Sequence, residues 1–285
     1  MPNTTATDLT NGQIAMVGQA RYTFEHKTLC TNIFKKVTLG PGEKSHYIPK
    51  FGRITANDLT DGIDMNEAQQ LAITGSTHTT DEAGCKVIIT KKLRAQLKED
   101  GYKAAGIVIG NAIRKKMDED GLGLFSGLDT SVGGAGTTFS YDYLRAAVSQ
   151  CYAQSEPVPL PLCTVLHPNH YDAVVNDIGS PGANNFPQDM QKEYMKMYFR
   201  GRDKLWGTDI YVDGNISVDA SDDAYGAVFH PSAFIYLVGW EPETWVEYDG
   251  SLRGWEIGIV SDYGMVEEDG TYGRSLYFDA STLTS

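Results

Sequence analysis

The feature that most constrains this chain is a long stretch without aromatic residues. No Phe, Trp or Tyr occurs from Gly52 to Gly101, although aromatic residues make up 11% of the 285 residues. A segment without large apolar side chains cannot build its own core, and an isolated pair of strands is only marginally stable in water. The segment is therefore either a disordered loop or is ordered by lying on another surface, which is the body of the same chain or a neighbouring subunit.

Strand signals around this stretch favour the ordered alternative. Tyr47 and Ile48 indicate a first strand, and Leu71 to Thr74 indicates a second short one. The run from Cys85 to Ile89 then returns to clear strand character. We therefore expect residues 41–90 to form a long two-stranded arm.

A long helical region follows the arm, from Lys91 to Phe125. Gly101 predicts a break between a short first helix and a second helix of about 20 residues, which would be roughly 30 Å long. The apolar residues of the second helix recur at every fourth position: Ala105, Ile109, Ile113 and Met117.

The rest of the chain predicts an α/β part and then a part rich in strands. The α/β part is expected to contain a helix from Ser140 to Ala153, a strand from Leu162 to Leu166, a helix that begins at Pro168, a helix from Gln188 to Phe199 and a strand from Asp209 to Val212. Strands are then expected at Tyr225–Phe229, Thr244–Tyr248, Trp255–Val260 and Tyr272–Phe278, with hairpin signals at Asp249-Gly250 and Asp269-Gly270. Three of the four Trp lie in this last part, so we expect its sheet to pack on the long helix.

The two ends of the chain carry opposite charge. Residues 1–50 hold six Lys and Arg against three Asp and Glu, whereas residues 213–285 hold two against fourteen, within a net charge of −13. Such an acidic chain is a poor general ligand for nucleic-acid phosphates. The asymmetry favours either contacts between subunits or an acidic face that only keeps the protein in solution.

The cysteines and the hydropathy exclude several classes of protein. Cys30, Cys85, Cys151 and Cys163 lie far apart without a CxxC pair, which favours packed, reduced thiols over a disulfide framework or a zinc module. No apolar run approaches the roughly 18 residues that span a bilayer, and the polar start lacks the pattern of a secretory signal. We expect the protein to stay in the cytoplasm in which it is made.

Candidate metal and catalytic sites are weak. His167 and His170 are three residues apart at a predicted helix start, but without an HExxH motif helix-start packing and capping explain them better than zinc. The acidic groups Asp213/Asp219/Asp222/Asp223 and Glu267/Glu268/Asp269 lack the spacing of a helix-loop-helix calcium site. The glycine-rich runs Gly121–Gly127 and Gly133–Gly136 lack phosphate-binding motifs and are expected to be linkers. We therefore predict no catalytic, cofactor-binding or metal-binding residues.

The order of these elements, together with several local motifs, resembles the major capsid proteins of tailed bacteriophages with the Hong Kong 97-type fold. The most telling match runs from Asp81-Glu82-Ala83-Gly84 through Ile88-Ile89-Thr90-Lys91 to Gly110-Asn111-Ala112-Ile113, and it resembles the passage from arm to spine helix in such subunits. Val165-Leu166-His167-Pro168, the run from Trp206 to Val212, and Phe229-His230-Pro231 resemble later blocks.

The resemblance implies an α+β fold with an N-arm, an extended β loop, a long spine helix, a peripheral domain and an axial α/β domain. The N-arm would be residues 1–40 and the extended β loop residues 41–90. Residues 91–137 and 213–285 would form the peripheral domain with the spine helix, and residues 138–212 the axial domain. No lysine–asparagine pair for a covalent crosslink can be matched.

The function that the resemblance implies is structural and not enzymatic. Copies of the chain would assemble as pentamers and hexamers into the icosahedral head shell of a virion, around double-stranded DNA that they bind without sequence specificity, after synthesis in the host cytoplasm. The further partners implied are a separate scaffolding protein, a portal and possible decoration proteins, and no membrane. Two alternatives stay open, an encapsulin-type cellular shell of the same fold and a cytosolic metal-dependent hydrolase that uses His167 and His170.

Overall fold

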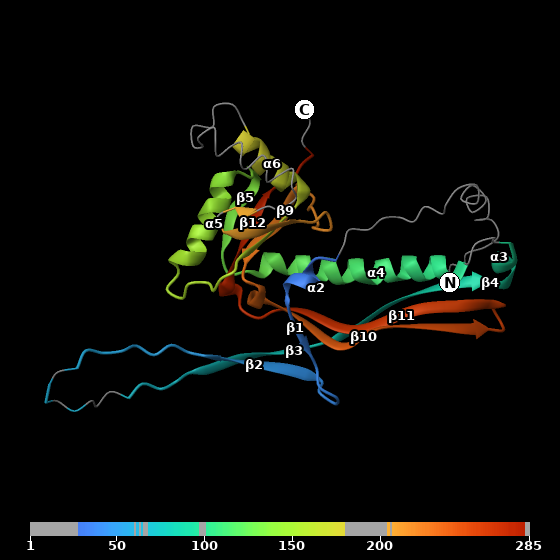
Figure 1. Cartoon of the computed structure of the whole chain (residues 1–285), viewed down its shortest axis with the longest axis horizontal. Coiled ribbons are helices and arrows are strands. Elements are labelled where there is room, and N and C mark those ends of the chain that lie inside the picture. Colours follow the sequence, from blue (N-terminus) through green and yellow to red (C-terminus); the bar gives the residue numbers. More distant parts are fainter. Residues whose placement is uncertain are drawn as a thin grey trace.

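The structure is a computed structural model that describes residues 28–59, 61–62, 64, 68–96, 101–179, 204–205 and 207–282. These residues form two larger sheets with their helices, and a two-stranded arm that projects away from both (Figure 1). The expected helix from Gln188 to Phe199 and the first 27 residues of the expected N-arm lie outside the described residues. None of the helices within the described ranges is both long and apolar enough to cross a membrane.

The first sheet has four strands and holds the strand that continues the arm. Its order is β1 (Lys35–Thr38), β10 (Phe234–Asp249), β11 (Gly254–Glu267) and β4 (Asp81–Thr90), of which only the β1–β10 pair is parallel. The hairpin expected at Asp249 is confirmed, because the β10–β11 register ends at Asp249 opposite Gly254. The Asp249 carboxylate accepts the backbone N–H of Ser251 at 2.7 Å and so stabilises the turn.

The long helix α4 (Gly101–Gly123) lies along one face of this sheet (Figure 1). It is preceded by a separate short helix, α3 (Lys91–Gln96), as the glycine at position 101 predicts. All four apolar residues of the predicted stripe, Ala105, Ile109, Ile113 and Met117, are at most 9% exposed. They share one core with Ile257 and Ile259 of β11, so the predicted packing of a C-terminal sheet on the long helix is confirmed. The four strands predicted for that sheet are divided, however, because Tyr225–Phe229 and most of Tyr272–Phe278 belong to the other sheet.

The second sheet has six strands and separates two cores. Its order is β5 (Ser131–Thr138), β12 (Gly273–Asp279), β9 (Asp223–Phe229), β6 (Cys163–Leu166), β8 (Thr208–Val212) and β7 (Lys204–Leu205). Helices α5 (Tyr141–Ala153) and α6 (Pro168–Gly179) supply residues to a core with Leu166, Val228 and Leu276. Neighbouring positions on the same strands, Val165, Ala227 and Phe229, belong instead to the core that contains α4, because successive side chains of a strand point to opposite faces. The sheet combines strands from two segments that were expected to form separate domains, 138–212 and 213–285.

The short helix α2 (Cys30–Ile33) packs on α4 and buries Cys30 there. Phe34, which follows it, stacks on Phe234 with ring centroids 4.9 Å apart and meets Phe229 edge-on at 5.9 Å. Phe234 begins β10 of the first sheet, and Phe229 ends β9 of the second sheet. These aromatic contacts therefore join the two sheets.

The prediction that both glycine-rich runs are linkers is wrong. Gly133–Gly136 lies within β5, which pairs in parallel with β12. A Cβ at Gly133 would come within 2.4 Å of the Phe278 ring, and its φ of +99° favours glycine. The other run, Gly121–Gly127, ends α4 and forms the 3₁₀ turn η2 (Leu124–Gly127). In each run a glycine lets another residue pack closely against the backbone: Phe278 against Gly133, and Cys30 against Gly121.

The hairpin predicted at Asp269-Gly270 is also wrong. The strands on either side, β11 and β12, belong to different sheets and are joined through a 3₁₀ turn, η4 (Gly270–Tyr272). The Asp269 carboxylate begins this turn by accepting the backbone N–H of Thr271 at 3.1 Å. An Asp-Gly pair fixes the local turn but does not determine whether the two flanking strands pair.

Replacing Ile113 of α4 with Ala should lower the free energy of unfolding by about 2–4 kcal/mol, because a side chain that is 4% exposed leaves a cavity against the sheet. Urea denaturation of the isolated subunit measures this. Val108 lies on the same helix but is 53% exposed, so Val108→Ala is the matched control and should change the value by less than about 0.5 kcal/mol. Equal losses for both variants would contradict the placement of the apolar stripe.

Candidate functional site

The candidate functional site is the two-stranded arm, which belongs to neither of the two larger sheets. Its strands β2 (Ser45–Phe51) and β3 (Ile73–Thr79) pair antiparallel, from Ser45 opposite Thr79 to Phe51 opposite Ile73. A two-stranded arm is thus confirmed, although its second strand begins and ends later than Leu71 to Thr74. The expected bounds 41–90 are too wide, because residues 81–90 form β4 of the four-stranded sheet. Gly52 N–H donates to the Ala72 carbonyl at 2.7 Å, and beyond this pair the two branches continue outward (Figure 1).

The arm exposes its apolar side chains to solvent. No buried core residue lies between Phe34 and Ile88 in the described part of the chain. Six large apolar side chains of the arm are instead 49–68% exposed, and Ile48 is half-buried. The six are Tyr47, Phe51, Ile54, Leu59, Leu71 and Ile73. A group of exposed apolar side chains on one projecting element is typical of a surface that contacts another protein.

Polar contacts fix the base of the arm to the body of the same chain. Lys50 Nζ contacts the Asp269 carboxylate and also lies 5.7 Å from the centre of the Tyr272 ring. His78 Nε2 is 3.1 Å from Glu268 Oε2. Lys50 is the last residue but one of β2 and His78 the last residue but one of β3, so the two contacts lie at opposite ends of the paired strands and hold both ends to the body. Just beyond β2, the Arg53 guanidinium donates to the Ser155 carbonyl at 2.7 Å and lies 3.6 Å from Glu156 Oε1, and the loop projects beyond this residue.

The ion pair at the base perturbs both of its members. The hydrogen bond from Lys50 to Asp269 raises the pKa of the lysine, although partial burial acts against it. Burial alone would raise the pKa of Asp269, but its hydrogen bonds from Lys50 and Thr271 outweigh burial and lower that pKa. Both groups are therefore charged at neutral pH. Lys36 also pairs with Glu241, at 2.5 Å. In both pairs a lysine of the basic segment 1–50 contacts a carboxylate of the acidic segment 213–285 within the same chain.

The two histidines singled out in the sequence lie in a packed region. His170 is fully buried, its Nε2 is 3.1 Å from the Phe278 carbonyl, and its ring packs 5.5 Å from Phe139. Burial lowers the pKa of His170 to about 4, so the ring is neutral at physiological pH. His167 Nδ1 accepts the Asn169 N–H at 3.3 Å at the start of α6. These contacts fit the packing and capping interpretation.

Several of the acidic groups considered as calcium ligands accept hydrogen bonds within the chain, although the buried Asp223 Oδ2 has no partner among the described residues. Asp219 accepts the backbone N–H groups of Ser221 and Asp223 and the hydroxyl of Tyr277 at 2.7 Å, and these bonds lower its pKa. Glu268 and Asp269 hold the arm. Within the described ranges, no three His, Cys, Asp or Glu side chains form a group that could hold a metal ion. The four cysteines are free thiols, and three of them are buried.

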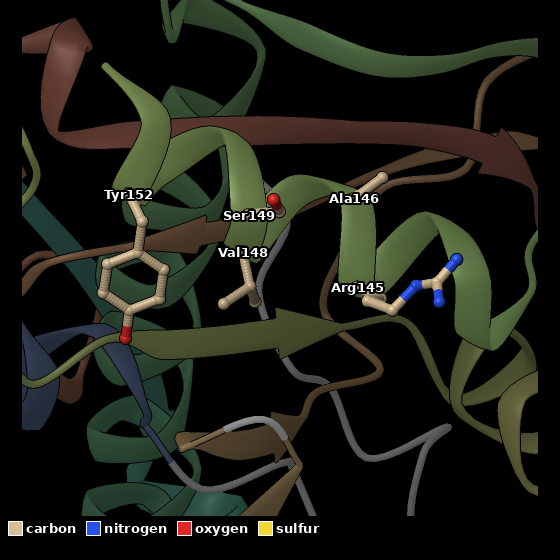
Figure 2. Close-up of a pocket in the computed structure, with 5 residues that line it drawn as sticks. All are labelled: Arg145, Ala146, Val148, Ser149 and Tyr152. Carbon is tan, nitrogen blue, oxygen red and sulfur yellow. The ribbon is translucent and has the colours of Figure 1, made fainter. Parts of the chain in front are cut away.

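A hollow on the outer side of α5 carries no acid–base groups among its described lining residues. Figure 2 shows Arg145, Ser149 and Tyr152 along the helix, with Ala146 and Val148 between them. Arg145 is paired with Asp142 one turn away, at 3.0 Å. These five lining residues include no carboxylate, histidine or cysteine. Ser149 could in principle act as a nucleophile, but none of the other four is a general base that would activate it.

No known protein family and no curated protein matches the sequence, whereas many solved structures match the fold. A structure of Mycobacterium phage Che8 has a TM-score of 0.72 at 15% identity, over 90% of this chain and 93% of that one. The capsid of Cyanophage P-SCSP1u gives 0.69 at 14% identity, over 93% and 92%. The acid-stable capsid of Helicobacter pylori bacteriophage KHP30 gives 0.68 at 9% identity, over 99% of both chains. The chain therefore has the α+β, Hong Kong 97-type fold of phage capsid subunits, as the sequence predicts.

Proposed function

We propose that this chain is the major capsid protein of a tailed bacteriophage. Copies of it assemble as pentamers and hexamers into the icosahedral head shell around double-stranded DNA. The protein is then a structural component of the virion, made and assembled in the host cytoplasm, and not an enzyme. The observation that carries the proposal is the arm, whose apolar side chains are 49–68% exposed although the rest of the chain has two well-filled cores.

The exposed arm supports assembly through contacts between unlike surfaces. Burying an aliphatic or aromatic side chain completely stabilises a contact by about 1.5–3 kcal/mol, so six partly exposed side chains are worth several kcal/mol for each arm. If the arm of each copy lies on the body of the next copy, every contact joins two different surfaces, the arm of one copy and the body of another. Such contacts propagate and form closed assemblies when the rotation between copies closes.

The proposed division of the chain into domains is based on the two sheets. We assign residues 1–40 to an N-arm, 41–90 to the extended loop, 91–137 and 213–285 to a peripheral domain, and 138–212 to an axial domain. The packing of α4 on the four-stranded sheet supports the peripheral assignment, and the separate core of α5 and α6 supports the axial one. Since β9 and β12 pair with β5 and β6, the axial sheet would extend into the C-terminal segment.

The proposed partners follow from the charge and from the fold. A net charge of −13 favours DNA that is enclosed without sequence-specific contacts over DNA that is bound tightly. A separate scaffolding protein and a portal are proposed for assembly, with decoration proteins as possible additions. An encapsulin-type shell would be recognised by purified particles that contain an enzyme in place of DNA. The low pKa and burial of His170 argue against the hydrolase alternative.

Shortening the arm should abolish shell formation without unfolding the subunit. Because Gly52 N–H already donates to the Ala72 carbonyl, residues 53–71 can be replaced by an Asn-Gly turn that closes the hairpin directly. We expect the variant to give native circular dichroism and to remain a monomer or small capsomer by sedimentation, with no particles by negative-stain electron microscopy.

The matched control for this deletion keeps the arm's length and its apolar surface. Thr55→Ser lies within the deleted segment and should assemble as the unaltered chain does. Normal shells from the shortened variant would contradict the proposed function. Loss of the subunit's own fold would instead show that the arm packs on its own body.

Removing the ion pair at the base of the arm should weaken assembly by a small, salt-dependent amount. In Lys50→Gln the arm loses a contact with the body, and we expect the concentration needed for shell formation to rise about twofold to fivefold at low salt, as for a pair in which the lysine side chain is still 46% exposed. The difference should shrink as salt screens the pair in the unaltered chain. Light scattering over a dilution series measures it. Lys44→Gln, on the same arm without a recorded ion pair, is the control and should leave that concentration unchanged.

A further inference from the structure

Two buried carboxyl groups meet where the N-terminal segment joins the body. Asp118, near the end of α4, is fully buried, and Asp213, which follows β8, is 3% exposed. Asn215 bridges the two groups, because its backbone N–H donates to Asp213 Oδ1 at 2.8 Å and its side-chain amide donates to Asp118 Oδ2 at 3.1 Å. Two negative charges buried side by side destabilise each other, which favours a proton on one of the two carboxyl groups.

The two carboxyl groups differ in the number of hydrogen-bond donors around them. Asp118 Oδ1 accepts the backbone N–H groups of Leu29 and Cys30, both at 2.9 Å, and Asp118 Oδ2 accepts the side-chain amide of Asn215 at 3.1 Å. Asp213 Oδ1 accepts a single backbone N–H, from Asn215 at 2.8 Å. Asp213 therefore has fewer donors to stabilise a negative charge, and the proton of the pair is placed on Asp213.

The other titratable groups near the pair do not compensate a second negative charge. Cys30 of α2 faces the pair, and burial raises the pKa of its thiol so that it stays neutral. No ion pair recorded for the described residues includes Asp118 or Asp213. Of the charged side chains within about one turn of Asp118 on α4, Arg114 is exposed to solvent, Lys115 pairs with Glu119, and Asp120 contacts Lys116 and Tyr263.

We propose that Asp118 and Asp213 form a proton-dependent clamp that fixes the exit of the N-terminal segment from the body and joins the two sheets. With one shared proton, Asp118 holds the start of α2 against α4 while Asp213 holds the strand end of the six-stranded sheet. When that proton is lost, two buried negative charges repel each other and the three elements separate at this point. The proposal goes beyond shell assembly, because it concerns the folded subunit itself.

The direction of the pH dependence follows from the position of the proton. Burial is the main cause that raises the pKa of Asp213; the Asn215 N–H acts against it, the neighbouring Asp118 adds to it, and together they raise the pKa to about 7 from its ordinary value near 4. The folded chain thus binds a proton that the unfolded chain has released between about pH 4 and pH 7. The stability that this proton contributes is complete below that window, falls as the pH rises through it, and is lost above about pH 7.

The test compares Asp213→Asn with the unaltered full-length chain from pH 5 to pH 8.5. The asparagine keeps a donor for Asp118 and an acceptor for Asn215 but carries no charge. We expect the unfolding equilibrium constant of the unaltered chain to rise about 10-fold to 100-fold more over this range than that of the variant. Hydrogen-exchange mass spectrometry, corrected for intrinsic exchange rates, should show the peptide 28–34 opening above pH 7 in the unaltered chain only.

Two further measurements separate the clamp from a purely structural role. Asp58→Asn removes an exposed carboxyl group on the arm and should leave the pH profile unchanged. The infrared absorption of a protonated carboxyl group should be present in the unaltered chain at pH 6, should disappear by pH 8.5, and does not depend on any variant folding. Equal pH profiles for Asp213→Asn and the unaltered chain, or no protonated carboxyl absorption at pH 6, would overturn the proposal.

Discussion

The packing of α4 on the four-stranded sheet is the constraint on which the other features depend. Ile109, Ile113 and Met117 fill the space against β4 and β11, and β4 is the strand through which the arm returns to the body. The register of β4 with β11, from Thr90 opposite Gly254 to Asp81 opposite Tyr263, therefore sets the direction in which the arm leaves. The arm is held by the hydrogen bonds between β4 and β11 and by the contacts of Lys50 and His78 with the body. Its outer part therefore loses less conformational entropy on binding a partner than a fully flexible loop would lose.

The six-stranded sheet extends this rigidity to the second half of the molecule. It is covered by α5 and α6 on one side, and on the other side Phe229 joins the aromatic cluster with Phe34, Phe125 and Phe234. Aromatic contacts of this kind are specific in geometry as well as apolar. Because the cluster takes residues from α2, from η2 and from both sheets, movement of one sheet against the other would break several contacts at once. The Asp118–Asp213 pair lies at the same junction and is its polar, titratable component.

The elements that depend on local pattern were predictable, and those that depend on distant contacts were not. The four-residue period of α4 and the turn at Asp249 specify their own structure. By contrast, Gly133 is placed in a strand by the Phe278 ring, and Asp269 is followed by a strand of another sheet. Asp118 begins an acidic block, Asp118 to Asp120, which follows the basic block Arg114 to Lys116 and is typical of a solvated helix face. Its burial is decided by Leu29 and Cys30, which lie 89 and 88 residues away in the chain, and no local signal reveals that contact.

The missing aromatic residues acquire a physical meaning once the arm is seen to stand free. A large aromatic side chain on its outer part would gain most by folding back onto the nearest apolar surface, which is the chain's own body. Ile54, Leu59, Leu71 and Ile73 are smaller and gain less from such a collapse, and the polar residues between them keep the loop hydrated. Their combined apolar surface still becomes substantial when all of them are covered together, which requires an extended partner surface and not a single pocket. An arm of this composition is thus poorly suited to packing on itself and well suited to lying across a second copy.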